Sequence, residues 1–174
     1  MKIIDISKEM FSADVYPGDP TPVLEWKKHI GDLVVADRVV QYDYDTTAIG
    51  EPLAYLSRVN RSDIPCDEAL SAALRTAAPG VYAGTVHTGC VATGDRFVAD
   101  GSFGLALGDR FGAIACEMEG GSIGQVCWLN GVPFAVLRAI SDNANEEGSV
   151  DFNSFARESA EKSQRLLQQV IPML

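Results

Sequence analysis

The sequence is poor in histidine and in positive charge. Two histidines occur in 174 residues, and 14 Lys and Arg stand against 24 Asp and Glu, which gives a formal net charge of −10. Nucleic acids and anionic membrane surfaces bind proteins through a basic face, so this balance argues against both as partners. No apolar run reaches the roughly 18 residues that a membrane helix needs, and no signal peptide is evident. We therefore expect a soluble, cytoplasmic protein.

Metal and cofactor motifs are also missing. The four cysteines show neither a CxxC pair nor the spacing of a Cys/His zinc site. No glycine pattern matches the dinucleotide fingerprint, and no Walker A sequence occurs. We expect no metal and no cofactor. We interpret Cys116 and Cys127, which lie in or beside apolar segments, as reduced core thiols.

The apolar pattern predicts strands that alternate with helices. Strands are expected over 33–42, 81–93, 113–116 and 134–140, and helices over 67–78, 102–110, 120–129 and 152–170. Residues 51–66 are expected to be irregular, and Asp67 is placed to favour the start of the first helix. Such alternation is typical of βαβ units around a largely parallel sheet, so the predicted fold class is α/β.

Two acidic motifs carry the strongest chemical signal. The run FAVLRAISD is interpreted as a buried parallel strand that ends at Asp142, and CEMEG places Glu119 at the start of a helix. Ligands of open α/β sheets lie beyond the carboxyl ends of strands, so we expect the two carboxylates to face one crevice. The alternatives are structural: Asp142 caps a turn, and acidic residues start the helix because its macrodipole favours them.

Residues 1–30 differ in character from the rest of the chain. Pro17, Pro20 and Pro22 leave little room for regular structure, and the segment is too short for a domain of its own. The words IIDISKEMFSADVYPGDPTP resemble the start of the cyclase family of metal-dependent hydrolases, which includes arylformamidases. The metal motif of that family, close to HxGTHxDxPxH, does not follow in this sequence. A metal hydrolase is therefore the less favoured interpretation.

A second resemblance covers residues 31–174. The words that carry it are GDLVVADRVVQYDYDTTAIG, TGDRFV, CEMEGGSIGQVC, GVPFAVLRAISDNA and DFNSF. They resemble the later part of the 5′-methylthioadenosine/S-adenosylhomocysteine nucleosidases, in the purine nucleoside phosphorylase-like superfamily. The resemblance implies a truncated form of that three-layer α/β fold, with a central mixed, mostly parallel sheet. It also implies an adenine nucleoside thioether as the small-molecule substrate, and a homodimer.

The same resemblance implies roles for the motif residues. Asp142 would be the general acid for the departing adenine, with Ser141 as its orienter, and such an acid contributes about 10²–10⁴-fold. Glu119 would accept the ribose hydroxyls in charge-assisted hydrogen bonds. A structural role for Glu117 stays open beside a substrate-binding one. The other substrate-binding residues implied are Phe97 and Val98 at the adenine, Glu117 and Met118 at the sugar, and Phe152 as a second aromatic wall.

One part of the family pattern has no counterpart in these 174 residues. The MEEE-type segment, whose glutamate activates the attacking water, is not found. We expect hydrolysis of the N-glycosidic bond, with release of adenine and a thioribose product, to be impaired by the lack of that glutamate. The alternative is a purine-nucleoside-binding or interaction module without turnover.

Overall fold

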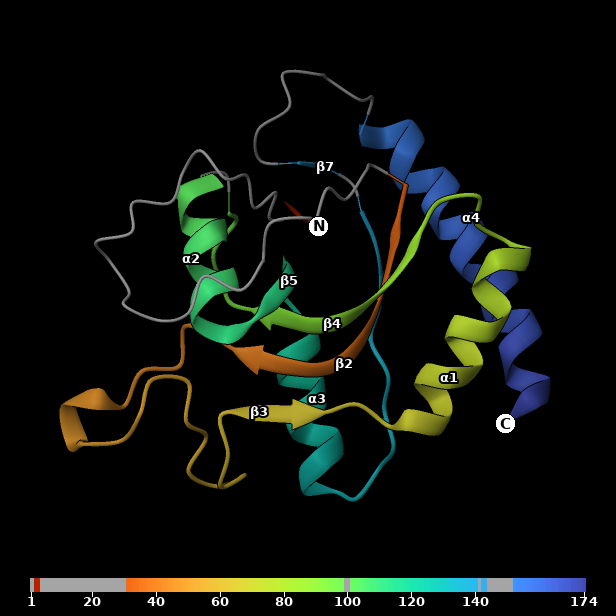
Figure 1. Ribbon diagram of the computed structural model, residues 1–174. Helices are drawn as coiled ribbons and strands as arrows, with labels where there is room; N and C mark the ends of the chain where they lie inside the picture. Colours follow the sequence, from red (N-terminus) through yellow and green to blue (C-terminus); the bar gives the residue numbers. More distant parts are fainter. Residues whose placement is uncertain (1, 4–30, 99–100, 141, 144–151) are drawn as a thin grey trace.

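The computed structural model describes residues 2–3, 31–98, 101–140, 142–143 and 152–174. Within them, seven strands form one mixed sheet in the order β3-β2-β4-β5-β1-β7, and β6 pairs with β2 beside this path (Figure 1). The strands are β1 (Lys2–Ile3), β2 (Leu33–Gln41), β3 (Asp63–Pro65), β4 (Val86–Thr93), β5 (Ala113–Glu117), β6 (Leu137–Ala139) and β7 (Asp142–Asn143). The helices are α1 (Glu68–Ala77), α2 (Gly101–Phe111), α3 (Gly120–Leu129) and α4 (Phe152–Val170). The predicted α/β class is confirmed.

The strand β2 is the centre of the sheet. It runs parallel to β4 over its whole length and antiparallel to both β3 and β6. Its first four residues, 33–36, are fully buried. Successive side chains of a strand point to opposite faces, so a strand that is covered on both faces needs a nearly continuous apolar run. The sequence LVVADRVVQ supplies that run.

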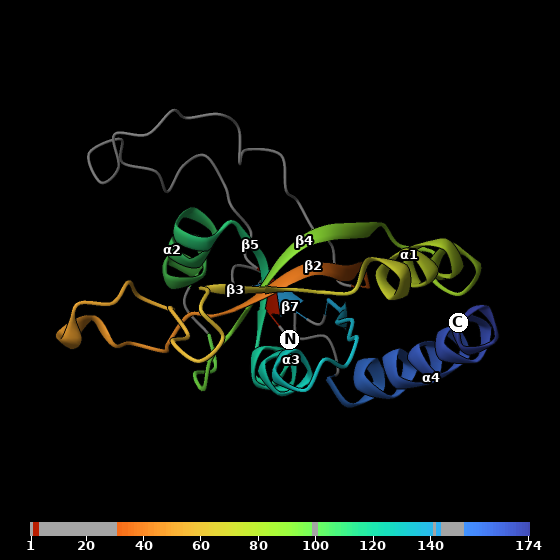
Figure 2. The same cartoon turned by 90° about the horizontal axis from the view of Figure 1, so that it is seen from below.

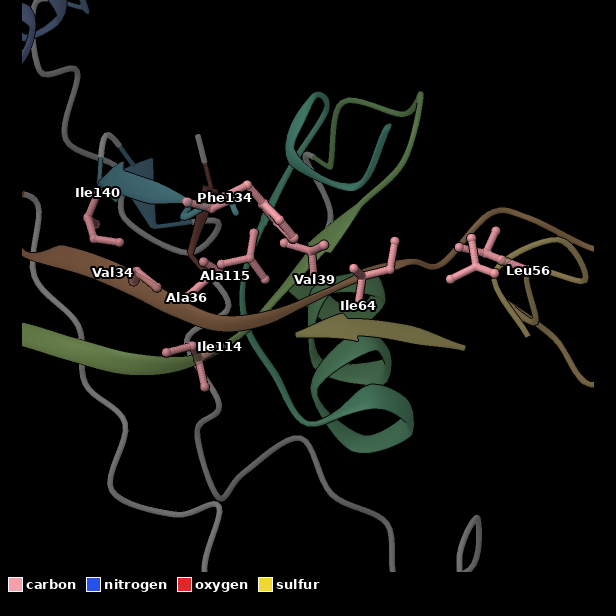
Figure 3. Close-up of a cluster of buried hydrophobic side chains, with 12 residues drawn as sticks. Val34, Ala36, Val39, Leu56, Ile64, Ile114, Ala115, Phe134 and Ile140 are labelled. Atoms are coloured by element: carbon pink, nitrogen blue, oxygen red, sulfur yellow. The ribbon is translucent and has the colours of Figure 1, made fainter. Parts of the chain in front are cut away.

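Helices cover both faces of the sheet and make three layers. Figure 2 shows α2 and α3 on opposite sides of the sheet, and α1 and α4 packed together at one end. The strand β2 contributes to every buried cluster: Val34 lies in the cluster of Figure 3, Val40 packs with α2, and Leu33 packs with α4. Burial of each such side chain stabilises the fold by about 1.5–3 kcal/mol.

Glycines bring the start of α3 close to the sheet. A Cβ atom on Gly121 would lie 2.8 Å from the Cβ of Thr93, and one on Gly124 would lie 3.0 Å from the ring of Phe134. Carbon atoms in good contact lie about 3.5–4.0 Å apart, so neither position accommodates a side chain without a shift. The N-terminus of α3 therefore lies directly against the carboxyl end of β4.

One strand starts later than predicted, and another was not predicted. The strand β4 begins at Val86 instead of residue 81, because a short 3₁₀ helix (Ala78–Gly80) precedes it and the N–H groups of Val81 and Tyr82 donate to the carbonyl of Ala78. The short strand β3 was not predicted at all. It has three residues inside a segment without apolar alternation, which is too little pattern to detect.

The strand β6 differs most from expectation. It covers three of the predicted residues 134–140 and runs antiparallel to β2, so the prediction of a buried parallel strand was wrong here. The strand starts late because the carbonyl of Phe134 accepts the N–H of Asp67 outside the ladder. Its antiparallel direction is set by the pairing of Leu33 with Ala139 and of Val35 with Leu137. The carboxyl end of β6 consequently points toward the amino end of β2, where the N–H of Ile140 donates to Asp32.

The strands β1 and β7 extend the sheet beyond β5. Lys2 is the register partner of Cys116 in β5 and of Asp142 in β7, so the first residues of the chain add a strand between these two. Residues 4–30 lie outside the described residues, and the predicted division of the chain at residue 31 stays a prediction. Among the described residues, no helix combines the length and apolar character needed to cross a membrane.

Candidate active site

The carboxyl ends of β4 and β5 lie side by side, and polar residues gather there. Thr93 at the end of β4 and Glu117 at the end of β5 are register partners in a parallel pair. The N–H of Gly94 donates to the carbonyl of Glu117 (3.1 Å), which joins the two chain segments where the strands end. This is the edge at which ligands of open α/β sheets bind.

A cavity of about 140 Å³ opens at this edge. Its wall consists of residues 96–98 after β4, residues 116–119 at the end of β5, and Arg138 of β6. The structure thus brings together five residues that the sequence singled out, namely Phe97, Val98, Glu117, Met118 and Glu119.

The carboxylate of Glu117 is the most enclosed polar group of the site. Its side chain is 2% exposed. It accepts hydrogen bonds from the hydroxyl of Thr93, from the N–H groups of Glu119 (3.0 Å) and Gly120 (2.8 Å), and from the guanidinium of Arg138. An anion at the N-terminus of a helix is stabilised by the unpaired N–H groups and by the macrodipole. Glu117 therefore anchors the start of α3.

Glu119 has the opposite environment. Its side chain is 62% exposed, and it occupies the N-cap position of α3 without making a side-chain cap. Its carboxylate instead accepts a hydrogen bond from Arg138 Nη2 (3.1 Å). Met118 lies between the two glutamates in sequence, and its thioether is partly exposed at the cavity wall. The motif CEMEG thus presents one buried carboxylate and one carboxylate open to a ligand.

Arg138 links these two carboxylates, and sequence reasoning did not single it out. Its Nη2 donates to both Glu117 and Glu119, while its Nε is buried and has no hydrogen-bond partner. A signal for it existed in the sequence. Arg138 is the single charged residue between Glu119 and Asp142, within a strongly apolar segment. A lone charge in such a segment is rarely buried unless it is paired.

The segment after β4 forms the apolar side of the cavity. Val98 is buried, whereas the side chain of Phe97 is 68% exposed. The segment is held from behind: the carbonyl of Arg96 accepts the hydroxyl of Tyr42 (3.5 Å), and the Arg96 guanidinium lies 4.3 Å from the centre of the Phe103 ring. Burial, followed by the nearby charge of Asp43, raises the pKa of Tyr42, so its hydroxyl stays a neutral donor.

The remaining predicted residues come from the later part of the chain. Asp142 belongs to β7, where its backbone pairs with Lys2, and Lys2 in turn pairs with Cys116 at the cavity wall. Asp142 therefore reaches the sheet through β1, not as the end of a parallel strand. Ser141 lies outside the described residues. Phe152 is the first residue of α4.

A second hollow, of about 470 Å³, lies at the other end of α3. Its lining includes Trp128, Phe134, Asp67 and Glu68. Both acidic side chains are engaged, because Asp67 caps α1 through the N–H of Leu70 (2.9 Å) and Glu68 pairs with Arg75 (2.5 Å). The smaller cavity is the better candidate, because the residues that the sequence singled out for ligand binding line it and do not line this hollow.

Histidine and metal chemistry receive no support from the arrangement of the described residues. His87 pairs with Asp32 (Nε2 to Oδ2, 2.9 Å), and His29 lies outside the described residues. Among the described residues, no group of three or more His, Cys, Asp or Glu side chains is placed to hold a metal ion. The four cysteines are free thiols, and Cys116 is buried beside the cavity while Cys127 packs against the core.

The structure is an α/β protein with a candidate site at the carboxyl ends of two parallel strands, lined by paired charges and an aromatic ring. The profile of the Phosphorylase superfamily matches residues 27–172, and the chain belongs to this family. The match agrees with the resemblance found in the sequence over residues 31–174.

Within the family, the chain is similar to nucleosidases. The aminodeoxyfutalosine nucleosidase of Campylobacter jejuni is 40% identical over 134 residues, which cover 77% of this chain and 58% of the relative. The crystal structure of 5′-methylthioadenosine/S-adenosylhomocysteine nucleosidase from the same species superposes with a TM-score of 0.78 at 36% identity, over 85% of this chain and 64% of that one. A Helicobacter pylori nucleosidase mutant, solved with 5′-methylthioadenosine in its active site, gives a TM-score of 0.75 at 34% identity, over 86% and 64%. The chain thus spans about three fifths of the length of these relatives.

Proposed function

We propose that this chain binds an adenine nucleoside with a 5′-thioether substituent and hydrolyses its N-glycosidic bond. The observation that carries the proposal is the exposed carboxylate of Glu119, held by Arg138 in the same cavity as Phe97 and Met118. A nucleoside needs these two kinds of contact, because it has a polar sugar and a flat aromatic base. The names of the relatives support the same class of substrate.

The sugar would lie against Glu119. Two neighbouring ribose hydroxyls both donate well to a carboxylate, and hydrogen bonds to an ionised acceptor are about twice as strong as neutral ones. As the bond to the base breaks, positive charge builds on the sugar. Glu117, Glu119 and Arg138 together carry one net negative charge, which favours that transition state over the neutral substrate.

The base would stack on Phe97, whose exposed ring offers a face of adenine size. When the bond between the sugar carbon and the base nitrogen breaks, its electron pair leaves with the adenine. Asp142 is the proposed general acid that protonates this leaving group, with Ser141 as its orienter and Phe152 as a second aromatic wall. A water molecule then adds to the sugar carbon and loses a proton. No glutamate of a MEEE-type segment is found in these 174 residues to take that proton, so we propose that turnover is slow relative to binding.

Binding and turnover are tested separately. Isothermal calorimetry should detect 5′-methylthioadenosine binding to the wild-type chain, and Glu119→Gln should weaken it by about 10–100-fold, because hydrogen bonds to charged groups are lost. Glu161→Gln on the exposed face of α4 is the matched control. Absence of binding heat at millimolar ligand would reject the proposal. In an adenine-release assay, Asp142→Asn should lower any measured rate by about 10²-fold or more, and an unchanged rate would remove Asp142 from the mechanism.

The 5′ substituent is a separate question, because the relatives carry two different substrate names. We propose the methylthio or homocysteinyl thioether as the substituent. Competition calorimetry with 5′-methylthioadenosine and aminodeoxyfutalosine ranks the two directly. Tighter binding of aminodeoxyfutalosine than of 5′-methylthioadenosine would contradict the proposed substituent and favour aminodeoxyfutalosine as the substrate.

A homodimer is part of the proposal. The outer face of α3 exposes Ile123, Val126 and Leu129, at intervals of three residues, in a helix without a charged side chain. An exposed patch of large apolar side chains is typical of a protein–protein interface. Sedimentation should show a dimer, and Val126→Glu should shift it toward the monomer.

A further inference from the structure

The buried carboxylate of Glu117 has no acceptor site left for a ligand. Four donors surround it: the Thr93 hydroxyl on one oxygen, the N–H of Glu119 and Arg138 on the other, and the N–H of Gly120 shared between both (2.9 and 2.8 Å). A carboxylate offers about four lone-pair sites. With its side chain 2% exposed, Glu117 lines the cavity without being free to bind a sugar hydroxyl.

Arg138 lies between Glu117 and Glu119 and donates hydrogen bonds to both carboxylates. An isolated pair as exposed as Arg138 and Glu119 contributes little to stability, because both long side chains lose freedom when they pair. Here the guanidinium is already fixed by a buried anion, so less freedom is lost when Glu119 joins it. The same Nη2 atom contacts both carboxylates.

Thr93 fixes the other side of Glu117. Its hydroxyl donates to Glu117 and accepts the N–H of Gly121 (2.7 Å), and its side chain is buried at the end of β4. The chain of contacts therefore runs from Thr93 through Glu117 and Arg138 to Glu119. Every link except the last is buried or half-buried.

We propose that Glu117 is a positioning residue, which acts on the ribose only through Arg138 and Glu119 and is itself oriented by Thr93. This inference rests on the proposed function, in which Glu119 accepts the ribose hydroxyls. It assigns the two glutamates of CEMEG different tasks: Glu119 contacts the substrate, and Glu117 keeps Arg138 where it can hold Glu119.

A double-mutant cycle distinguishes positioning from direct contact. Calorimetry would compare 5′-methylthioadenosine with its 2′-deoxy analogue on the wild type, Glu117→Gln, Glu119→Gln and the double variant. We expect Glu119→Gln to abolish the preference for the ribose ligand, Glu117→Gln to lower it about 10-fold, and the double variant to match Glu119→Gln within about twofold. If Glu119→Gln keeps part of the preference and the double variant loses more of it, Glu117 contacts the ligand directly and the proposal is overturned.

Thr93 provides a matched pair of variants in case Glu117→Gln folds poorly. Thr93→Val keeps the shape and loses the hydroxyl, whereas Thr93→Ser keeps the hydroxyl. We expect Thr93→Val to lower the ribose preference about as much as Glu117→Gln and Thr93→Ser to restore it to within about twofold of the wild type. Equal preference in the two variants contradicts the proposal.

A measurement without ligand separates this inference from the proposed function. Nitrogen NMR of the Arg138 Nη2–H groups, which donate to Glu117 and Glu119, should show slow hydrogen exchange in the wild type and in Glu119→Gln, and at least about 10-fold faster exchange in Glu117→Gln. Unchanged exchange in Glu117→Gln would overturn the positioning role even if the chain binds nucleosides. The expected exchange pattern together with no nucleoside binding would reject the proposed function and leave Arg138 anchored by Glu117.

Discussion

The carboxylates of Glu117 and Asp32 are both buried, but they lie at opposite ends of the parallel strands and hold different partners in place. Glu117 ends β5 with its side chain 2% exposed, and Asp32 precedes β2 with its side chain 6% exposed. Each accepts at least one main-chain N–H and each faces a basic side chain. Asp32 accepts the N–H of Thr85 (2.9 Å) and pairs with His87 (2.9 Å), so it joins the amino ends of β2 and β4.

The two carboxylates differ in what else their basic partner contacts. Arg138 extends from Glu117 to a second carboxylate that is open to a cavity, whereas His87 belongs to β4 and ties Asp32 to the neighbouring strand. Burial of a carboxylate is therefore not enough to mark a functional site, because a strand junction uses the same chemistry. The distinguishing feature is an exposed charge that the buried pair holds in place.

The largest effect is expected from Glu117→Ala. Removing one member of a buried ion pair leaves Arg138 and the N–H groups of α3 without their acceptor, which costs about 3–5 kcal/mol. Urea unfolding should show this loss in the free energy of unfolding. The control is Glu119→Ala, where we expect about 0.5 kcal/mol or less, since the side chain is exposed. Equal losses in the two variants would contradict the division of tasks between the glutamates.

A smaller effect is expected from Asp32→Asn. The amide oxygen still accepts the N–H of Thr85, but the charged hydrogen bond to His87 is lost, and such bonds contribute about 1.5–3 kcal/mol. Stability should fall while the affinity for 5′-methylthioadenosine stays within about twofold of the wild type. A large loss of affinity at unchanged fold would show that the two ends of the strands are coupled, and the comparison would fail.

Much of this fold was readable from local sequence pattern. The bounds of α3 and α4 agree with the prediction, because glycine pairs, apolar spacing and a terminal asparagine or proline mark their ends. The predicted N-terminal role of Asp67 is confirmed by its bond to the N–H of Leu70. The strand predicted over 33–42 is confirmed as β2, Leu33–Gln41.

The arrangement of the charges was not readable in this way. Nothing in the word CEMEG tells which glutamate is buried, because that depends on the strand register which sets Glu117 beside Thr93. The contact between Arg138 and Glu117 joins β6 and β5, which do not pair with each other, so no local sequence pattern indicates it. Strand direction was likewise a tertiary property, and the apolar content of residues 134–140 could not show that β6 runs antiparallel.

A third test acts on the packing beneath the site. Gly121→Ala adds a Cβ within 2.8 Å of Thr93, and overpacking of this kind costs about 1–3 kcal/mol. Because the N–H of Gly121 donates to Thr93, the shift should also reduce the preference for the ribose ligand. Ala106→Ser, which adds one atom on the exposed side of α2, is the control. A Gly121→Ala variant with wild-type stability would show that α3 can move off the sheet freely.

The smallest effect is expected from Cys66→Ala, measured as a change in the pH dependence of the free energy of unfolding. Unlike Glu117, Cys66 is a partly buried ionisable group without a basic ion-pair partner among the described residues. Burial raises the pKa of Cys66 to about 11, whereas the thiol of an unfolded chain ionises near 8.5. The unfolded chain therefore loses this proton at a lower pH than the folded protein, so stability falls as the pH rises from about 9 toward 11. Cys66→Ala should make the free energy of unfolding less dependent on pH in this window while leaving ligand affinity unchanged. If the free energy of unfolding depends on pH equally in the variant and the wild type, Cys66 is solvated in the folded protein and is not buried as Glu117 is.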